Sequence, residues 1–354
     1  AGQIDPTHAA MQLELARLKR RQGDLDGALA LLKQLASRTL PPRLARQHHF
    51  EAGLALDRAG HYEQAFAAYE EGNRLLAQNI RRREIDPRAF DRECRRLEQW
   101  LERGAPGAQP RDTDPGEDTG ADLCFLVGFW RSGTTLLGTL LATHPDVVSI
   151  DERPTLERVI DALRARKPGY PDVLESLEGA GLQELRQRYR AEAGRYLDGR
   201  QAAIIVDKLP LRFMHAGLIH RLFPDARILF SLRHPCDAVL SNFMQPYAAT
   251  DASIHFGTLQ GSVAMYVRTL SLWRGIEECL PLRPHYTRYE DLVADPQAEM
   301  AAVCAFLGIE PVAAMFDAEA RAAGRWVNYR VQLAPYLDAM RPLATHYGYS
   351  LAGP

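Results

Sequence analysis

GFWRSGTT, residues 128 to 135, follows a short apolar run and precedes an amphipathic segment. Gly128 and Gly133 flank four residues, which is the glycine spacing of the phosphate-binding loop of ATPases. Thr134 and Thr135 stand where that loop carries its Lys-Ser/Thr pair. Loop amides at a helix amino terminus form a cradle for an oxyanion, so the stretch predicts an anion site. A turn that only begins a helix is the alternative.

The region after residue 122 alternates short β-branched runs with helical stretches. The runs lie at 123–127, 147–150, 203–206, 227–232 and 285–289. This alternation predicts an α/β fold, a P-loop-type parallel sheet with flanking helices on both faces. In such sheets ligands bind beyond the carboxyl ends of the strands, where we expect one crevice.

The first hundred residues predict only helices, and they contain a repeat. QGDLDGALALL from Gln22 matches AGHYEQAFAAY from Ala59 at an offset of 37, which is 59 minus 22. This period is close to that of tetratricopeptide helix pairs, and an unrelated pair of helical hairpins is the alternative. With a third amphipathic helix, the pattern predicts a tetratricopeptide-like all-α domain at 1–103.

The segment 104–122 is rich in Gly, Pro and Asp and nearly devoid of apolar residues. Such a composition does not repay its ordering entropy by burial, so it predicts a linker. The catalytic domain then covers 123–354.

The amino-acid composition argues against several classes of function. A chain of 354 residues with 46% hydrophobic residues accommodates two domains, and a net charge of −2 gives no general reason to expect binding to nucleic acid or anionic membranes. The five cysteines lack CxxC spacing, which fits a reducing compartment and argues against a zinc site. No stretch approaches the ~20 apolar residues of a membrane span, and the amino end lacks a signal-peptide pattern, so we expect a cytoplasmic protein. A targeting segment removed before Ala1 stays open.

Charged residues stand at the ends of the first three runs. Arg131 lies inside the loop, where Ser132 and the two threonines add hydroxyl and amide donors. Glu152, which follows the second run, is placed to take a proton from an incoming hydroxyl or to cap the next helix. Lys208, which follows the third, is one of four lysines in the chain and suits charge developing on a leaving-group oxygen. An ordinary surface lysine is the alternative.

The last two runs suggest a second anion contact. Arg233 and Ser241 could clamp a further phosphate, whereas the neighbouring His234 lacks a partner at metal spacing and is interpreted as structural. Tyr289 either contacts a nucleotide or is a buried tyrosine at the end of a strand. Arg325, beside a tryptophan, suggests a cover over phosphate and base.

No aspartate stands at the usual strand end for magnesium, so we predict no metal site. Transfer of a γ-phosphoryl group depends on metal because much charge must be neutralised. A sulfuryl group carries less charge, which lysine, arginine and amide dipoles can neutralise. The pattern therefore points to 3′-phosphoadenosine 5′-phosphosulfate (PAPS) as donor.

At these residues the sequence resembles the sulfotransferase family. FLVGFWRSGTTLLGTLLATHPDV resembles its 5′-phosphosulfate loop, and ILFSLRHPCDAVLSNFM resembles its 3′-phosphate motif. The resemblance covers roughly Leu123 to Tyr349. It is strongest to tyrosylprotein sulfotransferases and to bacterial relatives that carry tetratricopeptide repeats in front, and it implies the sulfotransferase fold.

The resemblance also implies roles for individual residues. It makes Glu152 the catalytic base, Lys208 the catalytic lysine and Arg131 the arginine of the loop. The donor-binding residues are then Arg131, Ser132, Gly133, Thr134, Thr135, Arg233, Ser241, Tyr289 and Arg325. The segment between Phe316 and Gly324 is shorter than in the bacterial relatives, and the loop lacks a proline that many relatives have before the arginine.

The implied reaction is metal-independent, in-line transfer from PAPS to a hydroxyl, which releases 3′,5′-ADP. Peptide tyrosine, other phenols, alcohols and sugars all stay open as acceptors, and the repeats offer a surface for docking a protein or peptide. An acidic peptide would need basic residues near the cleft, for which Arg153, Arg158 and Arg212 are candidates. Two other readings stay open, a P-loop kinase or NTPase and a catalytically silent adaptor that carries the repeats.

Overall fold

A five-stranded parallel sheet forms the centre of the computed structural model, which describes residues 8–80, 85–109, 116–316 and 323–352. The strands are β1 (Leu123–Gly128), β2 (Val147–Asp151), β3 (Ile204–Lys208), β4 (Arg227–Leu232) and β5 (His285–Arg288). Their order is β2-β3-β1-β4-β5, and every neighbouring pair is parallel. All five expected runs form strands, so the predicted α/β sheet is confirmed.

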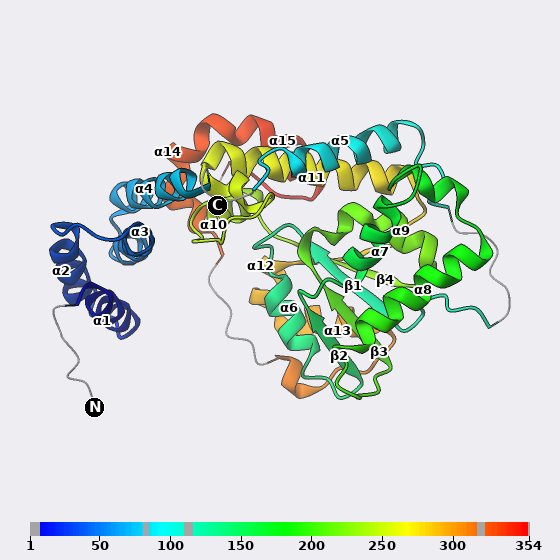
Figure 1. Cartoon of the computed structure of the whole chain (residues 1–354). Helices are drawn as coiled ribbons and strands as arrows, with labels where there is room; N and C mark the ends of the chain where they lie inside the picture. Colours follow the sequence, from blue (N-terminus) through cyan, green and yellow to red (C-terminus); the bar gives the residue numbers. More distant parts are fainter. Residues whose placement is uncertain (1–7, 81–84, 110–115, 317–322, 353–354) are drawn as a thin grey trace, which may run out of the picture.

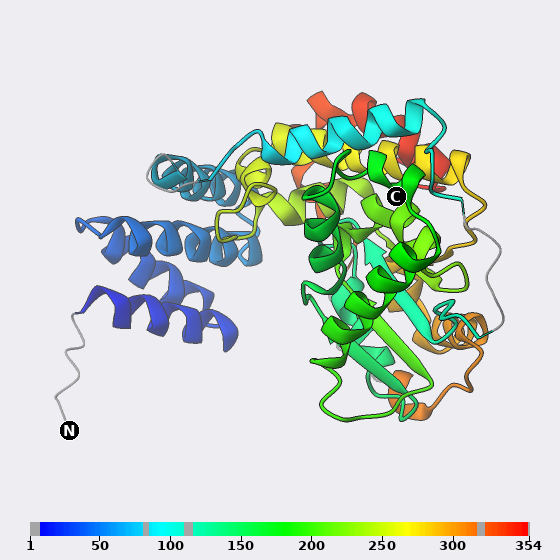
Figure 2. The same ribbon diagram turned by 45° about the vertical axis from the view of Figure 1, so that its right-hand side comes forward.

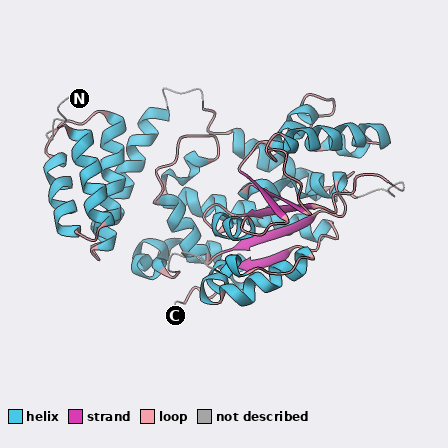
Figure 3. Ribbon diagram, turned by 90° about the horizontal axis from the view of Figure 1, so that it is seen from below, coloured by secondary structure: helices cyan, strands magenta, loops and turns pink. Residues whose placement is uncertain are grey.

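Helices cover both faces of this sheet (Figure 3). They are α6 (Thr134–Leu141), α7 (Thr155–Arg164), α8 (Gly179–Gly194), α9 (Ala216–Leu222), α10 (Pro235–Phe243), α11 (Leu259–Cys279), α12 (Tyr289–Ala294), α13 (Pro296–Leu307), α14 (Arg330–Leu333) and α15 (Leu337–His346). Short 3-10 turns connect them: η1 (Asp172–Ser176), η2 (Pro210–His215), η3 (Ser253–Gly257), η4 (Ala313–Phe316), η5 (Arg325–Tyr329) and η6 (Ala334–Tyr336).

The central strand β1 is buried on both faces. Because successive side chains of a strand point to opposite sides, Phe125 and Val127 enter one apolar cluster while Cys124 and Leu126 enter another. The second, smaller cluster contains buried side chains of α6 and α13. This burial explains why the strand appears in the sequence as a continuous apolar run.

Two helical hairpins precede the sheet and project from it (Figures 1 and 2): α1 (Ala9–Arg21) with α2 (Leu25–Ala36), and α3 (Pro42–Arg58) with α4 (Tyr62–Ile80). Gly23 and Gly60 occupy equivalent turns in the left-handed backbone region, at φ +87° and +82°. Gly53 permits close packing, since a Cβ there would lie 2.8 Å from the ring of Tyr69. The predicted helical hairpins are therefore present, whereas their tetratricopeptide character stays a prediction.

The third expected helix, α5 (Ala89–Glu102), does not extend the hairpins into a solenoid. It lies along α11 instead (Figure 1), where Arg268 pairs with Glu98 at 2.7 Å and with Asp91 at 3.0 Å. The buried side chain of Trp100 packs against Gly217 of α9. These contacts join α5 to the sheet-bearing part.

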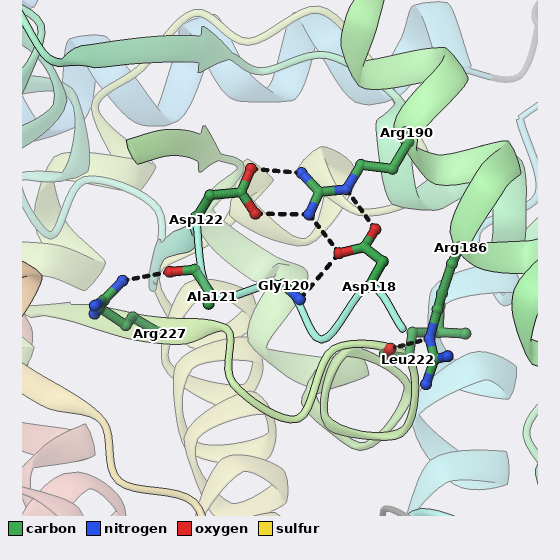
Figure 4. A network of polar contacts seen from close by, with 8 residues as sticks. All are labelled: Asp118, Gly120, Ala121, Asp122, Arg186, Arg190, Leu222 and Arg227. Carbon is green, nitrogen blue, oxygen red and sulfur yellow. Dashed lines mark hydrogen bonds and ion pairs between the residues drawn. The ribbon is translucent and has the colours of Figure 1, made fainter. Parts of the chain in front are cut away.

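The segment 104–122 is held in place wherever the structure describes it, contrary to the expectation of an unburied linker. Ala108 is fully buried, and Arg190 of α8 binds both carboxylates of Asp118 and Asp122 with N–O distances of 2.6 to 2.7 Å (Figure 4). Burial alone would raise the pKa of Asp118, but the hydrogen bonds from Arg190 lower it below the usual range. Asp118 and Asp122 therefore anchor the chain immediately before β1.

The second hairpin packs directly against the sheet-bearing part. Phe66 of α4 stacks on Phe243 of α10 with 5.0 Å between ring centroids, and Asn73 donates a 2.9 Å hydrogen bond to the Phe243 carbonyl. Phe50 and Tyr69 belong to the same buried apolar cluster as β1. The hairpin α3–α4 therefore shares the core that supports the sheet, whereas α1 and α2 pack in a small separate cluster that Ala55 of α3 completes.

Candidate active site

A cleft of about 830 Å³ opens at the carboxyl ends of the strands, and a residue close after each of the five strands lines it. Nine predicted site residues line this cleft: Arg131, Gly133, Thr134, Thr135, Glu152, Arg233, Ser241, Tyr289 and Arg325. The two others, Ser132 and Lys208, are buried with 2% of their surface exposed. A smaller hollow of about 510 Å³ between β5 and α15 contains none of them.

The loop after β1 turns sharply at its two glycines. Gly128 and Gly133 have φ values of +155° and +108°. A Cβ at Gly128 would collide with the carbonyl of Ser231, and one at Gly133 would lie 2.7 Å from the ring of Tyr289. Gly133 is also the N-cap of α6, so the helix amino terminus begins at the wall of the cleft. The reading of this stretch as only a helix-starting turn therefore fits the structure less well than a loop open to a ligand.

Arg131 connects this loop to α10. Its Nε donates a 3.2 Å hydrogen bond to Ser241 Oγ, and its carbonyl accepts one of 3.2 Å from Arg233. Its φ of +67° is uncommon for a residue with a side chain, and such strained positions concentrate at functional sites. The two anion contacts that the sequence predicted separately thus lie next to each other.

Two buried polar atoms at this place have no hydrogen-bond partner among the described residues: Ser132 Oγ and Arg233 Nε. Buried polar atoms are nearly always paired in native proteins, so each unpaired one calls for an explanation. Both atoms can donate a hydrogen bond to an anion. Ser132 lies in the loop after β1, and Arg233 belongs to the second predicted anion contact. An anion bound at each place would give these atoms hydrogen-bond partners.

Glu152 and Lys208 meet at the adjoining ends of β2 and β3. The Lys208 ammonium lies 3.0 Å from Glu152 Oε1 and also pairs with Asp151, the residue opposite it in the strand register. Glu152 has a φ of +49°, and its amide donates a 2.8 Å hydrogen bond to the Lys208 carbonyl. Because the Lys208 side chain is 2% exposed, the alternative of an ordinary surface lysine is wrong.

Capping is also not the role of Glu152. The helix that follows, α7, has Pro154 at its N-cap and no side-chain hydrogen bond there. The Glu152 side chain is 55% exposed and lines the cleft. It is therefore open to an incoming hydroxyl.

Arg233 lies over the face of Tyr289, with its guanidinium carbon 4.6 Å from the ring centroid. Tyr289 is 6% exposed and begins α12 rather than ending β5. It is mostly buried, as one of the two readings expected, and it also lines the cleft, while contact with a nucleotide stays a prediction. His234 is structural as interpreted, since it stacks on Trp326 and contacts the Ser350 carbonyl.

Arg325 reaches the cleft from η5, and Asp237 of α10 holds its backbone. Asp237 accepts hydrogen bonds of 2.7 and 2.9 Å from the amides of Gly324 and Trp326. The Arg325 side chain pairs with Asp57 of α3 at 2.8 Å, a contact that the sequence did not predict. Most of the segment noted as short, between Phe316 and Gly324, lies outside the described residues.

Sequence reasoning missed the carboxylate that organises the end of β3. Asp207 is fully buried, where it accepts hydrogen bonds from Thr155 at 2.6 Å and Tyr189 at 2.8 Å and pairs with Arg212. Arg212 also binds Glu157 at 2.7 Å and has no exposed side-chain surface, so its candidacy for contacting an acidic peptide is wrong. A charged residue that ends an apolar strand was the available signal.

The sequence reading also missed an aromatic wall formed by Trp130 of the loop after β1 and Tyr247 of the loop after α10, which Asn242 of α10 joins. Asn242 donates a 2.7 Å hydrogen bond to the Trp130 carbonyl and accepts one of 2.7 Å from the Tyr247 hydroxyl. Trp130 and Tyr247 both line the cleft. Burial raises the pKa of Tyr247, with Arg131 opposing and Glu152 adding to the shift, so this hydroxyl stays protonated.

Two kinds of feature are absent from the described residues. No three His, Cys, Asp or Glu side chains among them gather where they could hold a metal ion. None of their helices combines the length and apolar character needed to cross a bilayer.

Comparison with known proteins identifies the family. The model of a family described as "Sulfotransferase family" matches residues 124–313. The chain belongs to the sulfotransferase family. This match contains the loop after β1, Glu152, Lys208 and the Arg233–Ser241 clamp, and members of the family are transferases.

Curated relatives match parts of the chain. The nodulation protein NoeE of Sinorhizobium fredii is 29% identical over 217 residues, which are 55% of this chain and 52% of NoeE. Protein-tyrosine sulfotransferase 2 of Gallus gallus is 28% identical over 205 residues, 53% of this chain and 51% of that protein. An uncharacterized protein of Aquifex aeolicus is 25% identical over 262 residues, which are 72% of this chain and 33% of its own length. The chain thus spans about half or less of the length of these relatives.

Among solved structures, the sulfotransferase domain of the Synechococcus PCC 7002 olefin synthase aligns with 68% of this chain and 99% of that domain. The TM-score is 0.42 and the sequence identity 20%.

Proposed function

We propose that the chain transfers a sulfuryl group from PAPS to an acceptor hydroxyl. The observation that carries this proposal is the pairing of Glu152 with Lys208 at 3.0 Å, at the wall of a cleft that Arg131, Arg233 and Ser241 also line or border. A base, an ammonium and two arginine-based anion contacts are the parts that such a transfer needs. Family membership supports the same reaction class.

The two ends of the donor would bind to different elements. The loop amides, Ser132 and the amino terminus of α6 are suited to the 5′-phosphosulfate, because helix termini attract anions. Arg233 and Ser241 are suited to the 3′-phosphate, with Arg325 as a further cation. Tyr289 would support this end through the Arg233 guanidinium that lies on its ring.

In the proposed reaction the acceptor oxygen attacks sulfur in line with the bridging oxygen of the donor. Glu152 accepts the hydroxyl proton, the new O–S bond forms, and the bond from sulfur to the bridging oxygen breaks. The electron pair remains on that oxygen, so 3′,5′-ADP leaves with the added negative charge. Lys208, Arg131 and the loop amides would stabilise this charge. No metal ion takes part in the proposed steps.

The name of one relative suggests an acceptor class to test. Protein-tyrosine sulfotransferase 2 is named for a protein substrate, which makes peptide tyrosine one acceptor to test, beside other phenols, alcohols and sugars. Arg153 and Arg158 are exposed near the amino end of α7 and remain candidates for an acidic peptide. A mass-spectrometric screen of a lysate for products that gain one sulfuryl group would identify the acceptor.

We further propose the division into a tetratricopeptide-like helical domain at 1–103, whose last helix α5 packs on the catalytic part, a connection at 104–122 and a catalytic domain at 123–354. The equivalent turns at Gly23 and Gly60 support the repeat, and its exposed surfaces offer a protein or peptide a place to dock. A cytoplasmic, reducing location is supported by the five cysteines, all of which are free thiols.

Calorimetric titration with 3′,5′-ADP in the presence of a chelator tests the proposal. We expect saturable binding without metal, and slow release of 3′,5′-ADP from PAPS even when water is the only acceptor. Preferred binding of ATP with Mg²⁺ would favour a kinase or NTPase instead. Tight nucleotide binding without any donor hydrolysis or transfer would favour the silent adaptor.

A further inference from the structure

The ion pair between Asp57 and Arg325 joins two parts of the chain that are 268 residues apart. Asp57 lies in the last turn of α3, in the helical hairpins, and Arg325 begins η5 at the cleft. Arg325 Nε donates a 3.0 Å hydrogen bond to Asp57 Oδ1, and Nη2 lies 2.8 Å from Oδ2. The Tyr329 hydroxyl donates to the same carboxylate.

Asp57 places a negative charge at the carboxyl end of α3, where a positive charge is preferred. A helix carboxyl end carries partial negative charge, so a carboxylate in the last turn is unfavourable by about 0.3–1 kcal/mol. Where a residue breaks a local rule, a compensating interaction or a function is expected. Here the compensation comes from Arg325 and Tyr329, since 13% of the Asp57 side chain is exposed and both partners engage it.

Arg325 is held at its backbone and at its side chain. Asp237 of α10 holds the amides on either side of it, and Asp57 of α3 holds one edge of the guanidinium. A guanidinium has five N–H donors, so this arrangement leaves donors for an anion in the cleft that Arg325 lines. Burial alone would lower the pKa of Arg325, but Tyr69 and Asp57 raise it above its ordinary value.

The same hairpin also supports the aromatic wall of the cleft. Arg46 of α3 donates a 2.8 Å hydrogen bond to the carbonyl of Tyr247, and Asn73 of α4 donates one to that of Phe243. Tyr247 and the neighbouring Met244 line the cleft. The hairpin therefore touches the site at the Arg325 end and at the aromatic wall.

We infer that α3–α4 is a structural part of the donor site and that Asp57 is a positioning residue that holds Arg325 toward the phosphate of the bound nucleotide. This inference rests on the proposed function for the identity of the nucleotide. It gives the helical hairpin a role in donor affinity, in addition to any docking of a protein or peptide. Donor binding and the docking of the hairpin on η5 must then stabilise each other, because such coupling is reciprocal.

The test compares Asp57→Asn with Asp26→Asn in the full chain. Asp26 is a matched control because it is an exposed aspartate on α2, the other hairpin. For Asp57→Asn we expect the Kd for 3′,5′-ADP to rise about fivefold to tenfold, at the low end of typical coupling between sites. We also expect faster amide hydrogen exchange over residues 324–329. The control should change neither quantity.

A second background separates positioning of Arg325 from a general effect on the fold. In an Arg325→Gln background, Asp57→Asn should add less than twofold to the Kd, since its target is gone. The inference is overturned if Asp57→Asn raises the Kd as much in the Arg325→Gln background as it does alone. It is also overturned if Asp57→Asn alone changes neither the Kd nor the exchange rate. Failure of the unsubstituted protein to bind 3′,5′-ADP would instead refute the proposed function, and the exchange measurement would still decide whether Asp57 holds Arg325.

Discussion

Replacement of Lys208 by methionine tests the chemistry with little disturbance of the fold. Methionine retains an apolar stem of similar length in the buried position, where 2% of the lysine side chain is exposed. The substitution leaves Asp151 and Glu152 without their ammonium, but these side chains are 67% and 55% exposed, so water can solvate them. We therefore expect the free energy of unfolding to change by no more than about 1 kcal/mol.

The rate should respond far more strongly. If Lys208 stabilises the bridging oxygen as it gains charge, its loss lowers kcat by about 100- to 1,000-fold, or about 2.7–4 kcal/mol in the barrier. The assay is release of 3′,5′-ADP from PAPS, first with water and then with an identified acceptor. The Kd for PAPS, measured by calorimetry, should stay within about threefold, because the bridging oxygen gains its charge only as the bond to sulfur breaks.

Lys33→Met is the matched control, since Lys33 is an exposed lysine on α2. Near-normal turnover in folded Lys208→Met would refute the role assigned to this residue. A rate loss explained entirely by weaker nucleotide binding would also contradict it, because the ammonium would then serve the ground state and not the transition state.

Three further substitutions address the base, the buried carboxylate and the loop. Glu152→Gln should lower transfer to a hydroxyl by about 100- to 10,000-fold while 3′,5′-ADP still binds, and turnover with an acceptor within tenfold of normal would exclude Glu152 as the base. Arg212→Met should lower the free energy of unfolding by about 3–5 kcal/mol in denaturant titration, because Asp207 is left buried and charged. The control Arg341→Met breaks an exposed pair with Asp338 and should cost less than about 1 kcal/mol. Gly133→Ala should weaken 3′,5′-ADP binding, since its Cβ would meet the ring of Tyr289, and Gly199→Ala is the control because Gly199 has φ +73° and open space around it. Equal nucleotide affinity in these two glycine variants would argue against a tightly packed donor loop.

Most of the fold could be predicted from short-range patterns in the sequence. The five strands and Gly128 and Gly133 were predictable because apolar runs and glycine spacing depend on neighbouring residues. The adjacency of Glu152 and Lys208 followed from one further rule, that parallel strands end at the same edge of a sheet.

The features that the sequence did not predict depend on contacts between residues that are far apart in the chain. Nothing near Asp57 in the sequence indicates a partner 268 positions later, and an isolated Asp-rich segment gives no sign that Arg190 will bind it. The placement of α5 was missed for the same reason, because an amphipathic pattern shows that a helix has a buried face without showing what covers it. Arg212 looked like a surface arginine only because its two carboxylate partners come from other elements.

The left-handed backbone at Arg131 and Glu152 has a consequence for how this chain can change. Glycine would adopt both conformations at lower energetic cost, so a lineage under selection for stability alone would be expected to drift toward glycine at these two points. A guanidinium and a carboxylate at these points suit side chains that act on a ligand, so replacing either by glycine would separate its side-chain chemistry from the strain of its backbone.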